Sequence, residues 1–123
     1  MQQLKILEHF INKNYPNINV VGCKTIREKN GIAYSSRNFL LSLNQRIIAS
    51  KIYRLLKNNK SKLIKNKLYI KNIKNKILKL GATKIDYIES LNINKIIKPY
   101  KKGNNYKIFI AYYLKKIRLI DNV

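Results

Sequence analysis

Hydrophobic positions near the start of the chain recur at helical spacing. Leu4, Leu7 and Ile11 follow one another every three or four residues, so they share one face of a helix. An asparagine and a proline come next, and both are typical of a helix end. We therefore predict a helix over residues 2–14.

Two shorter patterns follow this helix. Adjacent valines within residues 19–23 predict a short buried strand. Residues 25–38 are rich in turn-forming residues, and the Asn30-Gly31 pair is the strongest turn signal in the chain.

The middle of the chain predicts two helices. The first begins at Ser42, whose hydroxyl can cap the first turn, with Gln45 three residues later completing a capping box. The second covers residues 61–80 and ends at Gly81, a residue that favours helix C-termini. Its apolar stripe consists of Leu63, Ile70, Ile73, Ile77 and Leu80.

The pattern then changes to strands. Residues 84–89 alternate with a period of two, residues 106–114 are rich in Ile, Phe and Tyr, and residues 118–120 predict a final short strand. The predicted fold class is α+β, with helices followed by a small sheet.

Composition excludes several protein classes. The 123 residues suit one domain, or one domain with a short appendage, and 46% hydrophobic content is too high for a disordered basic tail. A single cysteine, Cys23, excludes a disulfide framework, and a single histidine, His9, excludes a multi-histidine metal centre. We expect Cys23 to be a small buried residue and His9 to lie on a helix surface.

The net charge of +22 has two explanations. Lys, Ile and Asn number 22, 21 and 17 and make up 60 of the 123 residues, which is typical of an AT-rich genome. Lysine exceeds arginine by 22 to 5, whereas proteins that read bases or clamp phosphates favour arginine. We favour compositional bias, with the lysines of residues 61–80 forming a solvated face. The alternative is a non-enzymatic basic module that binds RNA or another polyanion.

No part of the sequence predicts a membrane span or a secretion signal. The longest apolar run, residues 108–114, is far shorter than the roughly 20 residues that a spanning helix needs. The first residues lack a basic segment followed by a long apolar one. With only one cysteine, we expect a cytoplasmic protein that binds no membrane and no specific nucleic acid.

Residues 25–38 carry the most chemistry. They hold two of the five arginines, Arg27 and Arg37, and the Ser35-Ser36-Arg37 triplet offers two hydroxyls and a guanidinium on one loop. Such a set suits phosphate oxygens. The alternative is structural: Ser and Asn side chains cap a helix and Arg37 pairs with a carboxylate.

The complete string resembles a family motif. Residues 27–38 read Arg-Glu-x-x-Gly-Ile-Ala-x-Ser-Ser-Arg-Asn, similar to the R-E-x-D-G-L-A-x-S-S-R-N loop of the pantothenate synthetase (pantoate–β-alanine ligase) family. Three further stretches agree in order with K-D-x-Q-Q-L, G-x-x-x-x-D-Y-x-E and R-L-I-D-N of the family, namely Gln2-Gln3-Leu4, Gly81 with Asp86-Tyr87-Ile88-Glu89, and Arg118-Leu119-Ile120-Asp121-Asn122.

The resemblance implies a fold and a reaction. It implies that residues 1–40 form the end of a Rossmann-like nucleotidyltransferase domain and that residues 41–123 form a small α+β lid domain with an antiparallel sheet. Family members use ATP and Mg²⁺ to convert pantoate into pantoyl adenylate, which β-alanine attacks to give pantothenate and AMP. No tightly bound cofactor or protein-held metal is implied.

The resemblance also implies site residues. Arg37 would stabilise phosphate charge in the transition state, with Ser35 and Ser36 as donors. Gln3 would bind pantoate. The residues expected to contact ATP are Ile26 (through its backbone), Tyr34, Ser35, Ser36 and Arg37.

Departures from the family qualify these expectations. The sequence begins inside the K-D-x-Q-Q-L motif, so we expect a C-terminal part that is either cut from a longer gene or paired with a separately encoded N-terminal half. Without that half we expect negligible ligase activity, and residues 1–38 to be poorly anchored. Lys115 replaces a family glycine and is expected to be strained if its φ is positive.

Overall fold

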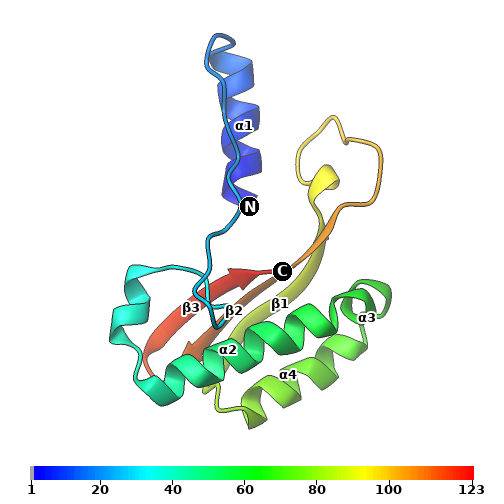
Figure 1. Ribbon diagram of the computed structural model, residues 1–123. Helices are drawn as coiled ribbons and strands as arrows, with labels where there is room; N and C mark the ends of the chain where they lie inside the picture. Colours follow the sequence, from blue (N-terminus) through cyan, green and yellow to red (C-terminus); the bar gives the residue numbers. More distant parts are fainter. Residues whose placement is uncertain (1) are drawn as a thin grey trace. The chain divides into compact units, whose positions relative to one another are not determined.

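A computed structural model describes residues 2–123 (Figure 1). Its helices and strands confirm the α+β class, and its sheet is small, antiparallel and three-stranded in the order β1-β2-β3. The elements are α1 (Gln2–Asn14), η1 (Ser36–Leu40), α2 (Leu43–Asn58), α3 (Lys60–Lys65), α4 (Tyr69–Lys79), β1 (Lys84–Asn92), η2 (Ile93–Lys95), β2 (Tyr106–Leu114) and β3 (Ile117–Asn122). None of the helices in residues 2–123 is long and apolar enough to cross a membrane.

The chain forms two compact units. One consists of the residues up to Lys24 together with Leu91–Lys107, and the other of Thr25–Ser90 with Ile108–Val123. The domain boundary near residue 40, which the family resemblance implies, stays a prediction.

The first unit confirms the predicted helix α1, on which His9 is exposed as expected. The predicted strand over residues 19–23 is wrong, because this segment is irregular and pairs with no strand of the described chain. Val21 is 79% exposed. A strand needs a hydrogen-bonded neighbour, which an apolar run cannot supply by itself. Cys23 is also exposed, so the expected burial is wrong.

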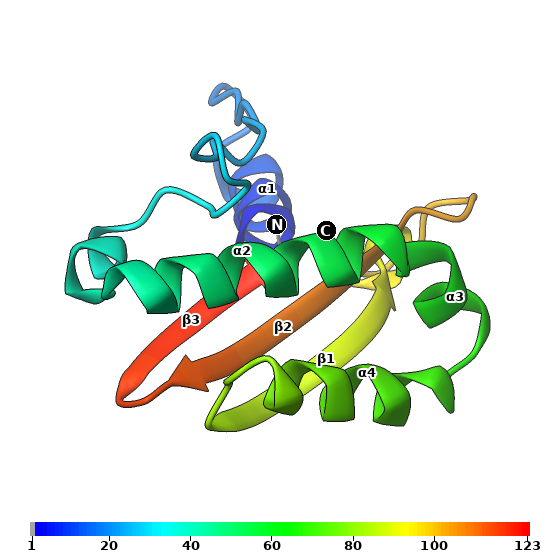
Figure 2. The ribbon, with the colours of Figure 1, turned by 60° about the horizontal axis from the view of Figure 1, so that its bottom comes forward.

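The second unit holds the main hydrophobic core. Helices α2 and α4 lie against one face of the sheet (Figure 2). Strands β2 and β3 pair antiparallel, with a register that runs from Phe109 opposite Asn122 to Leu114 opposite Ile117. The largest fully buried side chains are Ile52, Leu56, Leu63, Ile73, Ile77, Ile108, Ile110 and Leu114.

The predicted capping box at the start of α2 is confirmed. The Ser42 hydroxyl accepts the Gln45 N–H at 3.3 Å, and the Gln45 side chain accepts the Ser42 N–H at 2.8 Å. This is a complete capping box. Gly81 follows the end of α4 at φ +114°, a conformation that glycine adopts without strain.

The predicted helix over residues 61–80 is interrupted. It consists of α3 and α4, separated by Asn66–Leu68. The Asn66 side chain accepts the Leu68 N–H at 2.9 Å, which replaces helical hydrogen bonding by a local turn. The predicted apolar stripe nevertheless faces the core, with Leu63, Ile73 and Ile77 fully buried.

The strands extend the predicted ones. β1 continues to Asn92, β2 has the predicted bounds, and β3 covers Ile117–Asn122 instead of three residues. Lys115, in the tight turn between β2 and β3, has φ +54°. The expected strain at this position is therefore confirmed, because an L side chain in this region clashes with its own backbone.

Residues 25–38 are well anchored, contrary to the expectation for residues 1–38. They turn back on themselves, with the Glu28 N–H donating to the Ile32 carbonyl at 2.8 Å and an antiparallel bridge between Arg27 and Ala33. Gly31 lies at the tip with φ +94°, and a Cβ there would collide with the Tyr53 ring. The Asn30-Gly31 turn is confirmed.

Candidate functional site

The Ser-Ser-Arg loop is formed by a short helix and its cap. The Ser35 hydroxyl accepts the backbone N–H of Arg37 at 3.2 Å and so starts η1. The side chains of Tyr34, Ser36 and Arg37 are exposed. The Tyr34 N–H donates to the Ile26 carbonyl at 3.1 Å, which brings the backbone of Ile26 beside the loop. The structure thus brings together all five residues expected to contact ATP.

Gln3, the residue expected to bind pantoate, belongs to the other compact unit. It lies on α1 with an exposed side chain. Its role in binding pantoate stays a prediction.

Glu28 fixes the two ends of the loop. One carboxylate oxygen accepts the Asn38 side-chain amide at 2.8 Å, and the other accepts that of Asn30 at 3.1 Å. Arg46 of α2 adds an ion pair to Glu28 at 3.4 Å and donates to the Asn38 carbonyl at 2.9 Å. Buried polar groups that satisfy one another in this way hold a single backbone conformation.

Arg27 joins the loop to the last strand. Its guanidinium donates to both Asp121 oxygens at 2.9 Å, and also to the carbonyls of Gly31 at 3.1 Å and Asn122 at 2.7 Å. It lies 4.3 Å above the Tyr53 ring. Burial disfavours the charge, but the hydrogen bonds and negative charge of Asp121 outweigh burial and raise the pKa of Arg27. Arg27 is therefore a structural residue.

Arg37 differs from the paired arginines. Arg27, Arg46 and Arg118 pair with Asp121, Glu28 and Asp86 respectively. Within residues 2–123 the Arg37 guanidinium has neither an ion pair nor a hydrogen bond. The structural alternative is thus half right: Ser35 caps a helix, but Arg37 does not pair with a carboxylate. The loop presents a free guanidinium.

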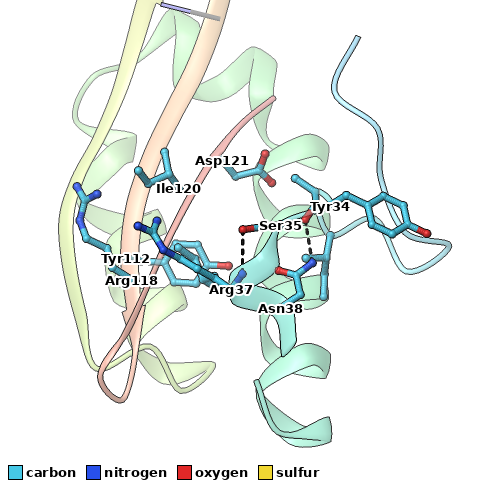
Figure 3. Close-up of a pocket in the computed structure, with 11 residues that line it drawn as sticks. Tyr34, Ser35, Arg37, Asn38, Tyr112, Arg118, Ile120 and Asp121 are labelled. Atoms are coloured by element: carbon cyan, nitrogen blue, oxygen red, sulfur yellow. Dashed lines mark hydrogen bonds between the residues drawn. The ribbon is translucent and has the colours of Figure 1, made fainter. Parts of the chain in front are cut away.

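A cavity of about 240 Å³ lies between the loop and the last two strands (Figure 3). From the loop side it is lined by Ser35, Arg37 and Asn38, and from the strands by Tyr112 and Arg118. The Asn38 side-chain oxygen is buried without a hydrogen-bond partner. The cavity therefore offers charged donors to a polar ligand, while the Asn38 oxygen is closed off from solvent.

The carboxylates near the loop are not arranged for a metal. No group of three His, Cys, Asp or Glu residues within residues 2–123 could hold a metal ion. Glu28 and Asp121, the acids closest to the loop in sequence or space, are taken up by Asn38, Arg46 and Arg27. The residues described here do not fit a protein-held Mg²⁺.

A comparison with protein families decides the identity. The family described as pantoate-beta-alanine ligase matches residues 1–123. The chain belongs to the pantoate–β-alanine ligase family. The pantothenate synthetase of Campylobacter hominis is 38% identical over 124 residues, and that of Caldicellulosiruptor bescii is 35% identical over 126 residues.

The fold agrees with solved structures of the same ligase family. The structure of pantoate-beta-alanine ligase from Francisella tularensis, in complex with "beta-gamma ATP" and beta-alanine, superposes with a TM-score of 0.72 at 32% identity. That match covers 98% of this chain and 39% of the Francisella chain. The two curated relatives are matched over 99% of this chain but only 45% of their own length. The chain thus spans less than half of a typical ligase.

Several structurally important residues were not identified from spacing alone. Asp86 and Arg118 are 32 residues apart and meet through a hydrogen bond of 2.8 Å, and that bond lowers the pKa of Asp86. Arg27 and Asp121 are 94 residues apart. All four residues lie within the strings that resemble the ligase family, so the available signal was their presence in the motifs.

Proposed function

We propose that this chain is the C-terminal part of an ATP-dependent ligase that joins pantoate and β-alanine. In that enzyme residues 1–40 form the end of the Rossmann-like catalytic domain, and residues 41–123 form the lid. The segment 19–23, whose Val21 is 79% exposed, is suited to contact with the rest of the enzyme.

The reaction has two steps. A pantoate carboxylate oxygen attacks the α-phosphorus of ATP, the bond between the α-phosphorus and the bridging oxygen breaks, and pyrophosphate leaves. The β-alanine amine then attacks the pantoyl carbonyl carbon, loses a proton and expels AMP, which leaves pantothenate. The first step places additional negative charge on the leaving pyrophosphate.

The free guanidinium of Arg37 is the observation that carries this proposal. A cation held where charge develops stabilises the transition state more than the ground state. Glu28 and Arg46 fix the loop, so Arg37 needs little rearrangement before the reaction. Ser35 and Ser36 are the hydroxyl donors beside it, Tyr34 packs against the nucleotide, and the Ile26 backbone borders the same site.

Mg²⁺ is proposed to arrive with ATP rather than with the chain. It binds phosphate oxygens and water readily, and needs few protein ligands. The chain described here supplies no free carboxylate cluster for it. We therefore assign no residue of this chain to the metal and derive no step from it.

The first step can be tested in a hybrid enzyme. The chain is fused behind the part of the Campylobacter hominis pantothenate synthetase that it does not match, and the exchange of labelled pyrophosphate into ATP is measured. Exchange that requires pantoate is expected, with a loss of at least about a hundredfold in Arg37→Ala. Arg54→Ala, an exposed arginine of α2, is the matched control. Equal rates for the two variants would reject the role of Arg37.

The 123-residue chain alone is expected to form no pantothenate, because it spans only 45% of its relatives. We propose that it acts with the remaining half of the ligase, whether linked or separately encoded. Pantothenate formation by the purified chain, free of host enzyme, would overturn this.

The net charge of +22 supports a second candidate, a basic module that binds RNA or another polyanion. Binding would then weaken steeply with salt, because it depends on many lysines that release counterions. Arg37→Ala would leave such binding almost unchanged. RNA binding with a shallow salt dependence and a strong Arg37 effect would contradict this candidate.

A further inference from the structure

The cavity beside the loop is lined by a tyrosine whose hydroxyl has no hydrogen-bond partner in the described chain. Tyr112 of β2 is only 4% exposed, yet within residues 2–123 its hydroxyl makes no hydrogen bond. Figure 3 shows this side chain directed from β2 toward the loop that carries Ser35 and Arg37. Burial, and then the charge of Asp121, raise the pKa of Tyr112 above its usual range, so the hydroxyl keeps its proton and can donate.

The same cavity receives a second arginine. Arg118 of β3 lines it opposite the loop, and Figure 3 shows the Arg37 side chain reaching toward this strand. Only the Nε of Arg118 is used by Asp86, at 2.8 Å, so its two terminal nitrogens keep their hydrogen-bonding capacity. Arg118 keeps its ion pair with Asp86, whereas Arg37 brings a cation without a partner to the same cavity, so the cavity attracts an anion.

The carboxylate of the cavity does not cancel the charge of Arg37. Asp121 lines it, but both of its oxygens accept hydrogen bonds from Arg27 at 2.9 Å. A cavity of about 240 Å³ is smaller than the roughly 300–1,000 Å³ that holds a drug-sized ligand. It therefore suits the phosphate end of a nucleotide better than the whole nucleotide.

We propose that this cavity is a diphosphate subsite, in which the Tyr112 hydroxyl and the Arg118 guanidinium contact the same anion as Arg37. The inference rests on the proposed function and extends it, since it assigns two residues of the sheet to the pyrophosphate that leaves in the first step. All of the proposed contacts come from one compact unit, so the subsite exists in the chain as it stands.

Pyrophosphate binding to the full 123-residue chain tests the subsite by calorimetry. The chain is strongly basic, so the informative variants leave its charge unchanged: Tyr112→Phe removes only the hydroxyl, and Arg118→Lys removes only the planar fork. Arg54→Lys is the matched control on an exposed arginine outside the cavity. Measurement at about 0.15 M salt suppresses diffuse attraction to lysines. AMP and inorganic phosphate are titrated in parallel.

We expect pyrophosphate to bind at one site, more tightly than AMP or inorganic phosphate. Tyr112→Phe and Arg118→Lys should each weaken binding at least about fivefold, and Arg54→Lys should not. Tyr112→Phe is expected to fold normally, because it removes a hydroxyl that has no partner; its circular dichroism spectrum checks this.

Two results would overturn the subsite and are separable from a failure of the proposed function. If Arg37→Lys weakens binding while Tyr112→Phe and Arg118→Lys do not, the loop binds the anion outside this cavity and the proposed ligase function stands. If none of the variants changes binding, the anion is held diffusely by lysines and the subsite is rejected. The ligase function is then judged by pyrophosphate exchange in the hybrid enzyme.

Discussion

Asp121→Asn removes the ion pair that joins the loop to the last strand while keeping the shape of the side chain. The pair has two hydrogen bonds of 2.9 Å, and the exposed fractions of the Arg27 and Asp121 side chains are 19% and 14%. Breaking a fully buried pair on one side costs about 3–5 kcal/mol, and one hydrogen bond to a charged group contributes about 1.5–3 kcal/mol.

The expected loss of unfolding free energy lies near the lower of these ranges. Water reaches part of Arg27, and the guanidinium keeps its bonds to the carbonyls of Gly31 and Asn122. We therefore expect a loss of about 2–3 kcal/mol. Urea unfolding followed by circular dichroism measures it, with an unchanged slope if only the folded state is affected.

Glu89→Gln is the matched control. It makes the same change in charge at an exposed carboxylate of β1 that has no partner in residues 2–123. We expect a change within about 0.5 kcal/mol for this variant. If Asp121→Asn destabilises the chain no more than Glu89→Gln does, the ion pair does not hold the loop and the structural argument is refuted.

Three further predictions concern strain, pH and local stability. Lys115→Gly should raise the unfolding free energy, measured by urea unfolding, by about 0.5–1 kcal/mol. The reason is that relief of about 1–2 kcal/mol of backbone strain exceeds the cost of the conformational entropy that glycine adds to the unfolded chain. An unchanged unfolding free energy would contradict the strain at φ +54°. Because the pKa of Asp86 is lowered, its pair with Arg118 stabilises the fold fully above about pH 4 and less as the pH falls through the lowered pKa. The wild-type chain should therefore lose more stability on acidification than Asp86→Asn. Equal losses in the two proteins would contradict this prediction. Amides of residues 2–24 should exchange hydrogen faster than those of α2 and β2, because Ile6, Phe10 and Val21 are 58%, 53% and 79% exposed. Equal protection would show that this segment is independently stable.

Local features of the fold were predictable because their causes are close in sequence. The Ser42–Gln45 capping box spans one helical turn, and the turn at Asn30-Gly31 depends on two neighbouring residues. The break at Asn66 was missed because a local side-chain hydrogen bond outweighs a continuous apolar stripe. The prediction of a strand over residues 19–23 was wrong because strand pairing depends on residues far away in the sequence.

The candidate site was predictable only in part for a related reason. The resemblance located Tyr34, Ser35, Ser36 and Arg37, and the structure brings them together with the Ile26 backbone. It could not tell which arginine is free. Arg27 and Arg37 look alike in the sequence, but Arg27 pairs with a residue 94 positions away, which no spacing rule reveals.

Formation of pantothenate by the hybrid enzyme tests the central claim most directly. The hybrid is supplied with ATP, pantoate and nitrogen-15-labelled β-alanine, and labelled pantothenate is quantified by mass spectrometry. We predict labelled pantothenate and an equal amount of AMP, both lost in Arg37→Ala and retained in Arg54→Ala. A folded hybrid that binds ATP yet forms no labelled pantothenate would contradict the assignment of this chain to a working ligase.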